Sequence, residues 1–152
     1  MSGAYRSFAH RVDIDVPVQR VWRAFTDSRL LEKWTARGAT VTPREKGSLR
    51  AVFGGIEHDS HIDVLTVPQR MRLILMPTRG MPAGEAAIVE DFLFEKLSPK
   101  ASAVRLLSSG VPSAPVWVTY YLQKRRHWEL ALTRLKVFLE KGLDEQPPEP
   151  RY

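Results

Sequence analysis

The sequence contains no cysteine, which excludes disulfide cross-links, a thiol nucleophile and a cysteine-ligated zinc site. It also has no apolar run near the roughly 20 residues that a transmembrane helix needs. Its first residues lack the apolar stretch of a secretory signal peptide. A P-loop, a G-x-G-x-x-G fingerprint and a G-x-S-x-G elbow are all missing. We therefore expect a cytoplasmic protein with no membrane span, no metal and no cofactor.

Positive charge exceeds negative charge, with 23 Lys and Arg against 17 Asp and Glu and a formal net charge of +6. Such an excess favours acidic partners. Most basic residues are scattered, and the one tight cluster is Lys124-Arg125-Arg126, with Arg134 further along the same segment. Nucleic-acid binders interleave such charge with exposed aromatic residues, and no stripe of that kind occurs. We predict no nucleic-acid binding, and a cluster that is either a solvated helix face or a docking site for an acidic protein surface.

The chain begins with a predicted strand and two short helices. Polar and apolar residues alternate over 6–16, which is typical of a strand with one buried face. Pro17 ends this strand and is tolerated in the first turn of a helix predicted over 17–27. Asp27 can cap a second helix over 28–35.

A run of strands follows the two helices. Turn-forming residues separate the strands, including Pro68-Gln69 and the loop 77–85. The Gly- and Pro-rich segment 110–115 predicts the end of the sheet. Consecutive strands favour an antiparallel meander. The predicted strands cover residues 40–44, 47–53, 58–67, 70–76, 86–97 and 103–109.

A long amphipathic helix is predicted over residues 115–141, and it ends at Gly142. It would span about 40 Å, enough to cross a sheet. A twisted meander curls, and only its concave face can cover the apolar stripe of this helix. The predicted fold is therefore α+β and of the helix-grip type, with about six curved antiparallel strands around the C-terminal helix. We expect one domain over 1–142 and a disordered tail over 143–152.

Several segments stand in a characteristic order: 16–27, Trp34, 63–71, 104–112 and His127-Trp128. In this order they resemble the START-like (SRPBCC) helix-grip superfamily. Within it they are similar to the branch of homologues of the Aha-type activator of a heat-shock chaperone ATPase. The resemblance spans residues 8–142 and implies a helix-grip fold with a central cavity. It also implies a place among lipid and hormone binders, aromatase/cyclase-like proteins and chaperone activators of the stress response.

Two polar residues stand out on the predicted concave face. Glu90 shares its face with Ile88 and Phe92, where a carboxylate is costly unless it is paired or at a rim. It is either a solvated rim residue or, in a pocket, a carboxylate with a raised pKa that could act as a general base. His58 and His61 are three apart on a strand and so face opposite ways, which argues against a shared metal. We expect His58 to reach the pocket.

Our leading interpretation is a non-enzymatic module that binds a small hydrophobic or amphipathic molecule between sheet and final helix. The segments 77–85 and 110–115 would gate the entrance. One alternative is an interaction module of the chaperone-ATPase-activator type; another is a cyclase- or hydrolase-like enzyme that uses Glu90 or His58. We assign no catalytic residue, and for each aromatic residue of the set the competing interpretation is that it fills the core. The predicted ligand-binding residues are Trp34, Phe53, His58, Met71, Leu73, Glu90, Phe92, Phe94, Leu106, Ser108, Trp117, Tyr120, Tyr121 and Trp128.

Overall fold

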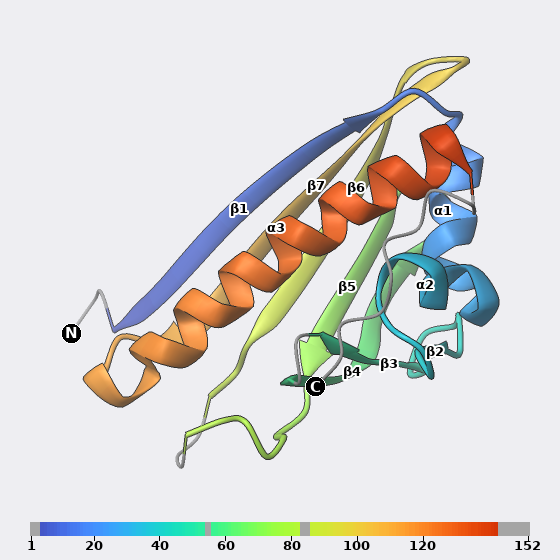
Figure 1. The fold of residues 1–152 in the computed structure, drawn as a ribbon. Coiled ribbons are helices and arrows are strands. Elements are labelled where there is room, and N and C mark those ends of the chain that lie inside the picture. The colour runs from blue at the N-terminus through green and yellow to red at the C-terminus, as the bar shows by residue number, and fades with distance from the viewer. Residues whose placement is uncertain (1–3, 54–55, 83–85, 143–152) are drawn as a thin grey trace.

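The computed structural model describes residues 4–53, 56–82 and 86–142. A single open sheet of seven antiparallel strands lies against a long C-terminal helix, with two short helices at one end (Figure 1). The strands are β1 (Tyr5–Ile14), β2 (Thr40–Val41), β3 (Ser48–Phe53), β4 (Ile56–Thr66), β5 (Arg70–Leu75), β6 (Val89–Ser98) and β7 (Ala101–Pro112). The helices are α1 (Val18–Thr26), α2 (Ser28–Trp34), the 3-10 turn η1 (Pro115–Trp117) and α3 (Val118–Lys141).

The strand order is β1-β7-β6-β5-β4-β3-β2. Strands β2 to β7 therefore form a meander, and β1 pairs with β7 at one edge of the sheet. Helix α3 crosses the concave face diagonally, while α1 and α2 cover the end near the C-terminus of α3 (Figure 1). The predicted helix-grip architecture is confirmed, with seven strands instead of about six. The strand predicted over 40–44 is present but shorter: it is β2, whose two residues pair with Leu49 and Arg50.

Local sequence signals explain where the helices begin and end. Pro17 precedes α1, and its φ of −59° already suits a helix start. The Asp27 side chain accepts hydrogen bonds from the backbone N–H groups of Arg29 and Leu30, at 2.9 and 3.4 Å, and so caps α2. Gly142 ends α3 with a φ of +90°. These predicted boundaries are confirmed.

The predicted end of the sheet was wrong. Gly110, Val111 and Pro112 belong to β7, where Val111 pairs with Arg6 and Pro112 with Tyr5. Gly110 has a φ of +90°, and a Cβ there would collide with the backbone of Ala87. The glycine therefore bends the strand without ending it. The gating segment proposed for 110–115 shrinks accordingly, because its first three residues belong to β7.

Other boundaries also differ from the prediction. The helix expected over 115–141 divides into η1 and α3, and β6 begins at Val89 instead of residue 86. A bulge between Ile62 and Val64 shifts the register of β4, so Leu65 and not Val64 packs against the core. The predicted tail 143–152, the turn glycines Gly54 and Gly55, and part of the loop 77–85 lie outside the described residues.

Candidate functional site

Four polar side chains are buried between the sheet and α3, and we call them the buried polar cluster: His58, Glu90, Ser108 and Lys124. Glu90 is 1% exposed, and Ser108 and Lys124 are fully buried. Ionised groups are costly to bury unless they are paired and hydrogen-bonded. The rim position considered for Glu90 is therefore wrong, and so is the solvated position considered for Lys124.

Glu90 and Lys124 form the central ion pair of the cluster. Lys124 Nζ lies 2.8 Å from Glu90 Oε2. The indole Nε1 of Trp128 donates a 2.6 Å hydrogen bond to the same oxygen. Lys124 Nζ also lies 3.4 Å from His58 Nδ1 and 5.7 Å from the centre of the Tyr120 ring. The ammonium is thus surrounded by a carboxylate, an imidazole nitrogen and an aromatic face.

The secondary structure brings these residues together. Glu90 pairs with Leu73 on β5 and with Ser108 on β7, so Glu90 and Ser108 point to the same concave face. On α3, Tyr120, Lys124 and Trp128 are spaced by four and therefore lie on the face that meets the sheet. The cluster therefore links neighbouring residues of β6 and β7 to the sheet-facing side of α3.

Burial sets the protonation of the cluster. Burial, and then the charge of Lys124, hold the pKa of His58 well below its ordinary value. The neutral ring accepts at Nδ1 from Lys124, which leaves its proton on Nε2. Burial also lowers the pKa of Lys124, and the carboxylate of Glu90 opposes that shift. Burial, and then Glu90, raise the pKa of Tyr120, so its phenol is neutral.

Hydrogen-bonding capacity remains unused in this cluster. Ser108 Oγ is buried and has no hydrogen-bond partner among the described residues. Glu90 Oε2, in contrast, accepts the hydrogen bond of Trp128 Nε1 and is paired with Lys124 Nζ. Other buried serines are satisfied: Ser60 donates to the carbonyl of Leu49 at 3.1 Å, and Ser102 to that of Val16 at 3.0 Å.

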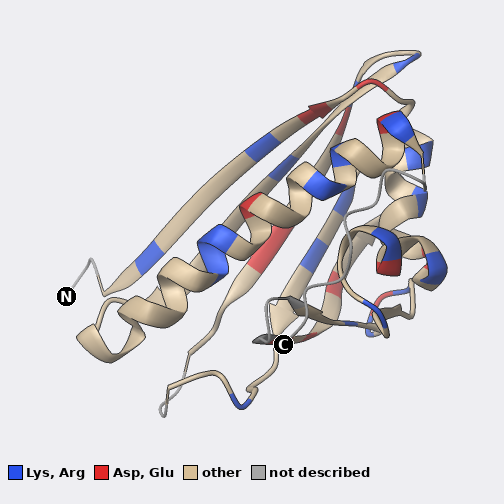
Figure 2. Ribbon diagram, in the orientation of Figure 1, with Lys and Arg blue, Asp and Glu red and all other residues tan. Residues whose placement is uncertain are grey.

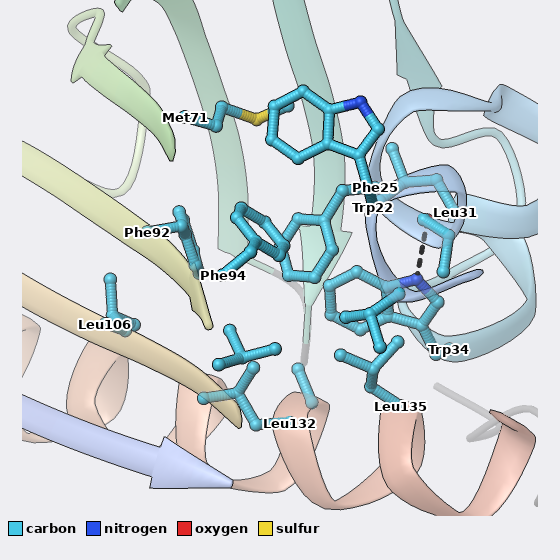
Figure 3. Close-up of a cluster of buried hydrophobic side chains, with 14 of the residues drawn as sticks. Trp22, Phe25, Leu31, Trp34, Met71, Phe92, Phe94, Leu106, Leu132 and Leu135 are labelled. Atoms are coloured by element: carbon cyan, nitrogen blue, oxygen red, sulfur yellow. Dashed lines mark hydrogen bonds between the residues drawn. The ribbon is translucent and has the colours of Figure 1, made fainter. Parts of the chain in front are cut away.

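The cluster separates two groups of apolar side chains. Glu90 of β6 stands between Phe92 and Ile88, the residue just before the strand. Along α3, Lys124 stands between Tyr120 and Trp128. The larger group, the main core, holds the aromatic side chains packed under α1 and α2 (Figure 3). The smaller group, the second hydrophobic cluster, consists of Leu75, Ile88, Val111, Trp117 and Tyr120.

The predicted ligand-binding residues divide between these regions. Tyr121 is half-buried, and its hydroxyl donates to the carbonyl of Ser7 at 2.8 Å. The side chain of Phe53 lies outside the described residues. Trp117 and Tyr120 belong to the second hydrophobic cluster, and the buried polar cluster contains His58, Glu90 and Ser108. The main core contains Trp34, Met71, Leu73, Phe92, Phe94, Leu106 and Trp128.

Lys124 is the central residue that the sequence interpretation placed wrongly. We grouped it with Arg125 and Arg126 as part of a basic surface, but it points inward. Its spacing of four from both Tyr120 and Trp128 was the signal that could have revealed this. Two of the other histidines lie apart from the cluster: His10 Nε2 is 2.9 Å from the carbonyl of Arg125, and His61 is exposed on the opposite face from His58. The half-buried His127 is near enough for the charge of Lys124 to lower its pKa, after burial.

The surface carries three described grooves, of about 530, 440 and 380 Å³. The first runs between α1 and β6, the second crosses β1, β7 and β6, and the third lies between β1 and α3. None of these three is lined by a member of the buried polar cluster. Within the described ranges, no group of three His, Asp or Glu side chains is placed to hold a metal. No helix there is long and apolar enough to cross a membrane.

The outward face of α3 differs sharply from its inward face. Arg125 and Arg126 are exposed, and Figure 2 shows basic residues at intervals along the helix. The apolar side chains of Val118, Leu122 and Leu130 are exposed on the same helix. We call these five residues the outer α3 stripe. It combines positive charge with exposed apolar surface.

Solved structures with the same fold include an Aha1 dimer and an HSP90 activator. The Aha1 dimer from Colwellia psychrerythraea has 18% identity and a TM-score of 0.75, over 90% of this chain and 98% of that one. An HSP90 activator from Plasmodium falciparum has 19% identity and a TM-score of 0.73, over 88% and 95%. The di-domain ARO/CYC protein BexL of the BE-7585A biosynthetic pathway has 15% identity and a TM-score of 0.70, over 89% and 46%.

At these identities the structural neighbours establish the fold alone. No curated protein matches the chain. The family is established by a match over residues 15–140 to the model described as "Activator of Hsp90 ATPase homolog 1-like protein". This confirms the branch that the sequence segments resemble. The chain belongs to the family of Activator of Hsp90 ATPase homolog 1-like proteins.

Proposed function

We propose that this protein binds a small amphipathic molecule between the sheet and α3. The polar group of the ligand would contact the buried polar cluster, and its apolar part would pack against the second hydrophobic cluster. The observation that carries this proposal is the placement of an ion pair, a neutral histidine and an unpartnered serine in the interior. Ligand sites in proteins combine apolar walls with a few convergent polar groups in this way.

Stability alone does not account for the cluster. Replacing a buried ion pair by apolar residues of similar volume is often neutral or stabilising. A buried hydroxyl without a partner costs about 1–3 kcal/mol. A core of this size could therefore be completed with apolar side chains, as it is around Phe25 and Phe92. The unpartnered hydroxyl of Ser108, beside the ion pair of Glu90 and Lys124, makes physical sense if a ligand completes its hydrogen bonds.

Ligand binding can be tested with neutral apolar probes. We expect Nile red and 2-methoxynaphthalene to bind saturably and to change the fluorescence of Trp117 and Trp128, which border the site. The variant Ser108→Leu adds volume at the cluster and should weaken binding, whereas Leu130→Ala, on the outside of α3, should not. Thermal melts would verify that both variants fold. Absence of saturable binding by the folded wild-type protein would refute the proposal.

A second candidate function is an interaction with a chaperone of the Hsp90 type. It is supported by the family and by the outer α3 stripe, which offers Arg125 and Arg126 beside exposed Leu122 and Leu130. Such a surface fits an acidic partner with an apolar anchor. Buried Lys124 takes no part in it.

This second function predicts binding that weakens with salt. Purified Hsp90-type chaperone should bind the immobilised protein at low ionic strength, and Arg125→Glu with Arg126→Glu should abolish that binding. Arg50→Glu, an exposed charge reversal on β3, is the matched control and should have little effect. Equal binding by the double variant and the wild type would contradict a role for the stripe.

A further inference from the structure

We infer that the edge of β6 beyond Leu93 binds an extended segment of a partner protein, with acidic side chains on one face and apolar side chains on the other. The segment would add a short strand to the sheet, beside β6 and in line with β5. It would lie in the groove of about 530 Å³ between α1 and β6. The inference concerns neither the interior site nor the outer α3 stripe, and it depends on neither.

Strand β6 is longer than its neighbour β5, so part of its edge has no strand beside it. β5 begins at Arg70, which pairs with Leu93, while β6 continues to Ser98. On its other side, β6 stays paired with β7 as far as Ser98 and Ala101. The β6–β7 hairpin therefore runs past the end of β5 (Figure 1). Among the described strands, none lies beside residues 95–98 on the β5 side.

The backbone of this edge faces the groove. The N–H of Phe94 donates to the carbonyl of Gln69, just before β5, at 2.8 Å. Alternate residues of a strand direct their backbone groups to the same edge, so those of Lys96 point the same way, past the end of β5. Glu95 and Lys96 line the groove, and Val18 of α1 lines it from the other side. A strand edge that opens into a groove is the geometry by which extended peptides add to a sheet.

The charges of the groove favour an acidic segment. Its charged lining residues are Glu95, Lys96 and Arg105. The carboxylate of Glu95 is paired with Arg105, whose Nη2 lies 3.3 Å from Glu95 Oε2. Within this lining, Lys96 therefore supplies the charge for a partner, and a carboxylate directly opposite it would form a favourable cross-strand pair. Lysine on a strand edge discourages pairing between copies, which favours a partner of opposite charge over a second copy of this chain.

The other face of β6 supplies apolar contacts. Side chains alternate between the two faces of a strand, so Leu93 lies on the face opposite to that of Lys96. Leu93 lines the groove and is 46% exposed. Leu97, which follows Lys96, is 45% exposed. A segment in which acidic and apolar residues alternate would place its carboxylates on the face of Lys96 and its apolar side chains on the face of Leu93.

A fluorescein-labelled peptide of alternating valine and glutamate tests the inference. Fluorescence anisotropy should show saturable binding, about tenfold tighter than for a peptide with the same residues in two separate blocks. A glutamate opposite Lys96 directs its N–H to β6, so N-methylation of the glutamates should weaken binding about fivefold or more. N-methylation of the valines, whose N–H groups point away from β6, is the matched control and should change affinity by less than about twofold.

A charge reversal in the protein tests the role of Lys96. Lys96→Glu should weaken binding of the valine–glutamate peptide about fivefold and should favour a peptide of alternating valine and lysine. Arg50→Glu changes the net charge equally, but on β3, and should leave the preference for glutamate intact. Amide hydrogen exchange followed by NMR should slow at Lys96 when the peptide binds, because its N–H gains a partner.

Several results would overturn the inference. Equal affinities of the alternating and block peptides would reduce the attraction to net charge, and equal effects of the two N-methylated peptides would exclude strand addition. Exchange that slows at Leu122 and Arg125, with Lys96 unaffected, would place the peptide on the outer α3 stripe. Self-association of the protein that protects Lys96 without peptide would assign the edge to a second copy of this chain.

Discussion

The two ends of the region between the sheet and α3 are stabilised by different interactions. Under α1 and α2, the ring of Phe25 lies 4.8–5.1 Å from the rings of Trp34, Phe92 and Phe94, and apolar side chains fill the surroundings (Figure 3). Towards the N-terminus of α3, the same sheet face carries Glu90 and meets Lys124 instead. One end is apolar throughout, and the other holds charges that must compensate each other.

This difference separates general stability from specific function. An apolar core tolerates most substitutions that keep its volume, because dispersion and burial depend on size and shape. A buried polar group depends on the identity of each partner, because an unmatched charge or hydroxyl keeps its desolvation cost. We therefore expect the aromatic end to respond to changes of volume, and the polar end to respond to charge and pH.

Removing a ring from the aromatic end should give a large loss of stability. Phe25→Ala should lower the free energy of unfolding by about 3–5 kcal/mol, because it deletes a ring with three aromatic neighbours and leaves a cavity. Urea denaturation monitored by circular dichroism measures this. Leu130→Ala, which removes an exposed side chain, should change stability by less than about 0.5 kcal/mol. Similar effects for the two variants would contradict the packing described.

At the polar end, an equally large loss should follow a change that hardly alters volume. Lys124→Met keeps the length of the side chain but leaves Glu90 buried without its cation, which should cost about 3–5 kcal/mol. The double variant Glu90→Gln with Lys124→Met removes both charges and keeps an acceptor for Trp128 Nε1. It should recover most of the loss in the same urea measurement.

The recovery is the discriminating result for the ion pair. If Lys124→Met costs less than about 1 kcal/mol, Glu90 is solvated and the buried polar cluster does not exist as described. If the double variant is as unstable as the single one, the loss comes from packing and not from charge.

Acidification should destabilise the polar end. His58 has a folded-state pKa well below its ordinary value, because burial and the charge of Lys124 oppose protonation. The unfolded chain therefore binds a proton near pH 6.5 while the folded protein does not. Stability is full above that pH and falls as the pH drops below it, by up to about 1.4 kcal/mol per pH unit. His127, whose pKa is also lowered mainly by burial, acts in the same direction.

Urea midpoints between pH 7.5 and 5 measure this dependence. His58→Gln should flatten the slope, because an amide does not titrate in that range. His61→Gln is the matched control, since His61 is exposed on the opposite sheet face. A slope that is unchanged by His58→Gln would mean that another group controls acid stability.

The fold could be predicted from the sequence because its signals are local. Alternation gave the strands, Pro17 and Asp27 marked the starts of α1 and α2, and Gly142 marked the end of α3. The prediction failed at Gly110, where turn-forming chemistry competes with strand pairing. The absent Cβ lets β7 pass close to Ala87, and pairing continues to Pro112.

The candidate site was less predictable because its contacts are not local. Glu90 was recognised as unusual, but its partner Lys124 comes from a helix that follows two further elements of the chain. A run of three basic residues suggested a solvated face, while the helical period turns Lys124 inward and leaves Arg125 and Arg126 outside. Periodicity could have identified Lys124 as buried, but only the packing of α3 on β6 determines its partner.

The smallest expected change in stability is a gain, whereas most substitutions of buried residues cause a loss. Ser108→Ala should raise the free energy of unfolding of the ligand-free protein by about 1 kcal/mol, because it removes a buried hydroxyl that has no described partner. Ser60→Ala should lower it, because the hydroxyl of Ser60 is bonded to the carbonyl of Leu49. Matched urea titrations compare the two serines. A gain in stability for Ser108→Ala together with altered binding of Nile red would mean that this serine is retained at the expense of stability for the sake of a ligand. If Ser108→Ala instead lowers the free energy of unfolding, the Ser108 hydroxyl makes an ordinary structural hydrogen bond. The polar end would then need no ligand to satisfy its buried groups, as the aromatic end needs none.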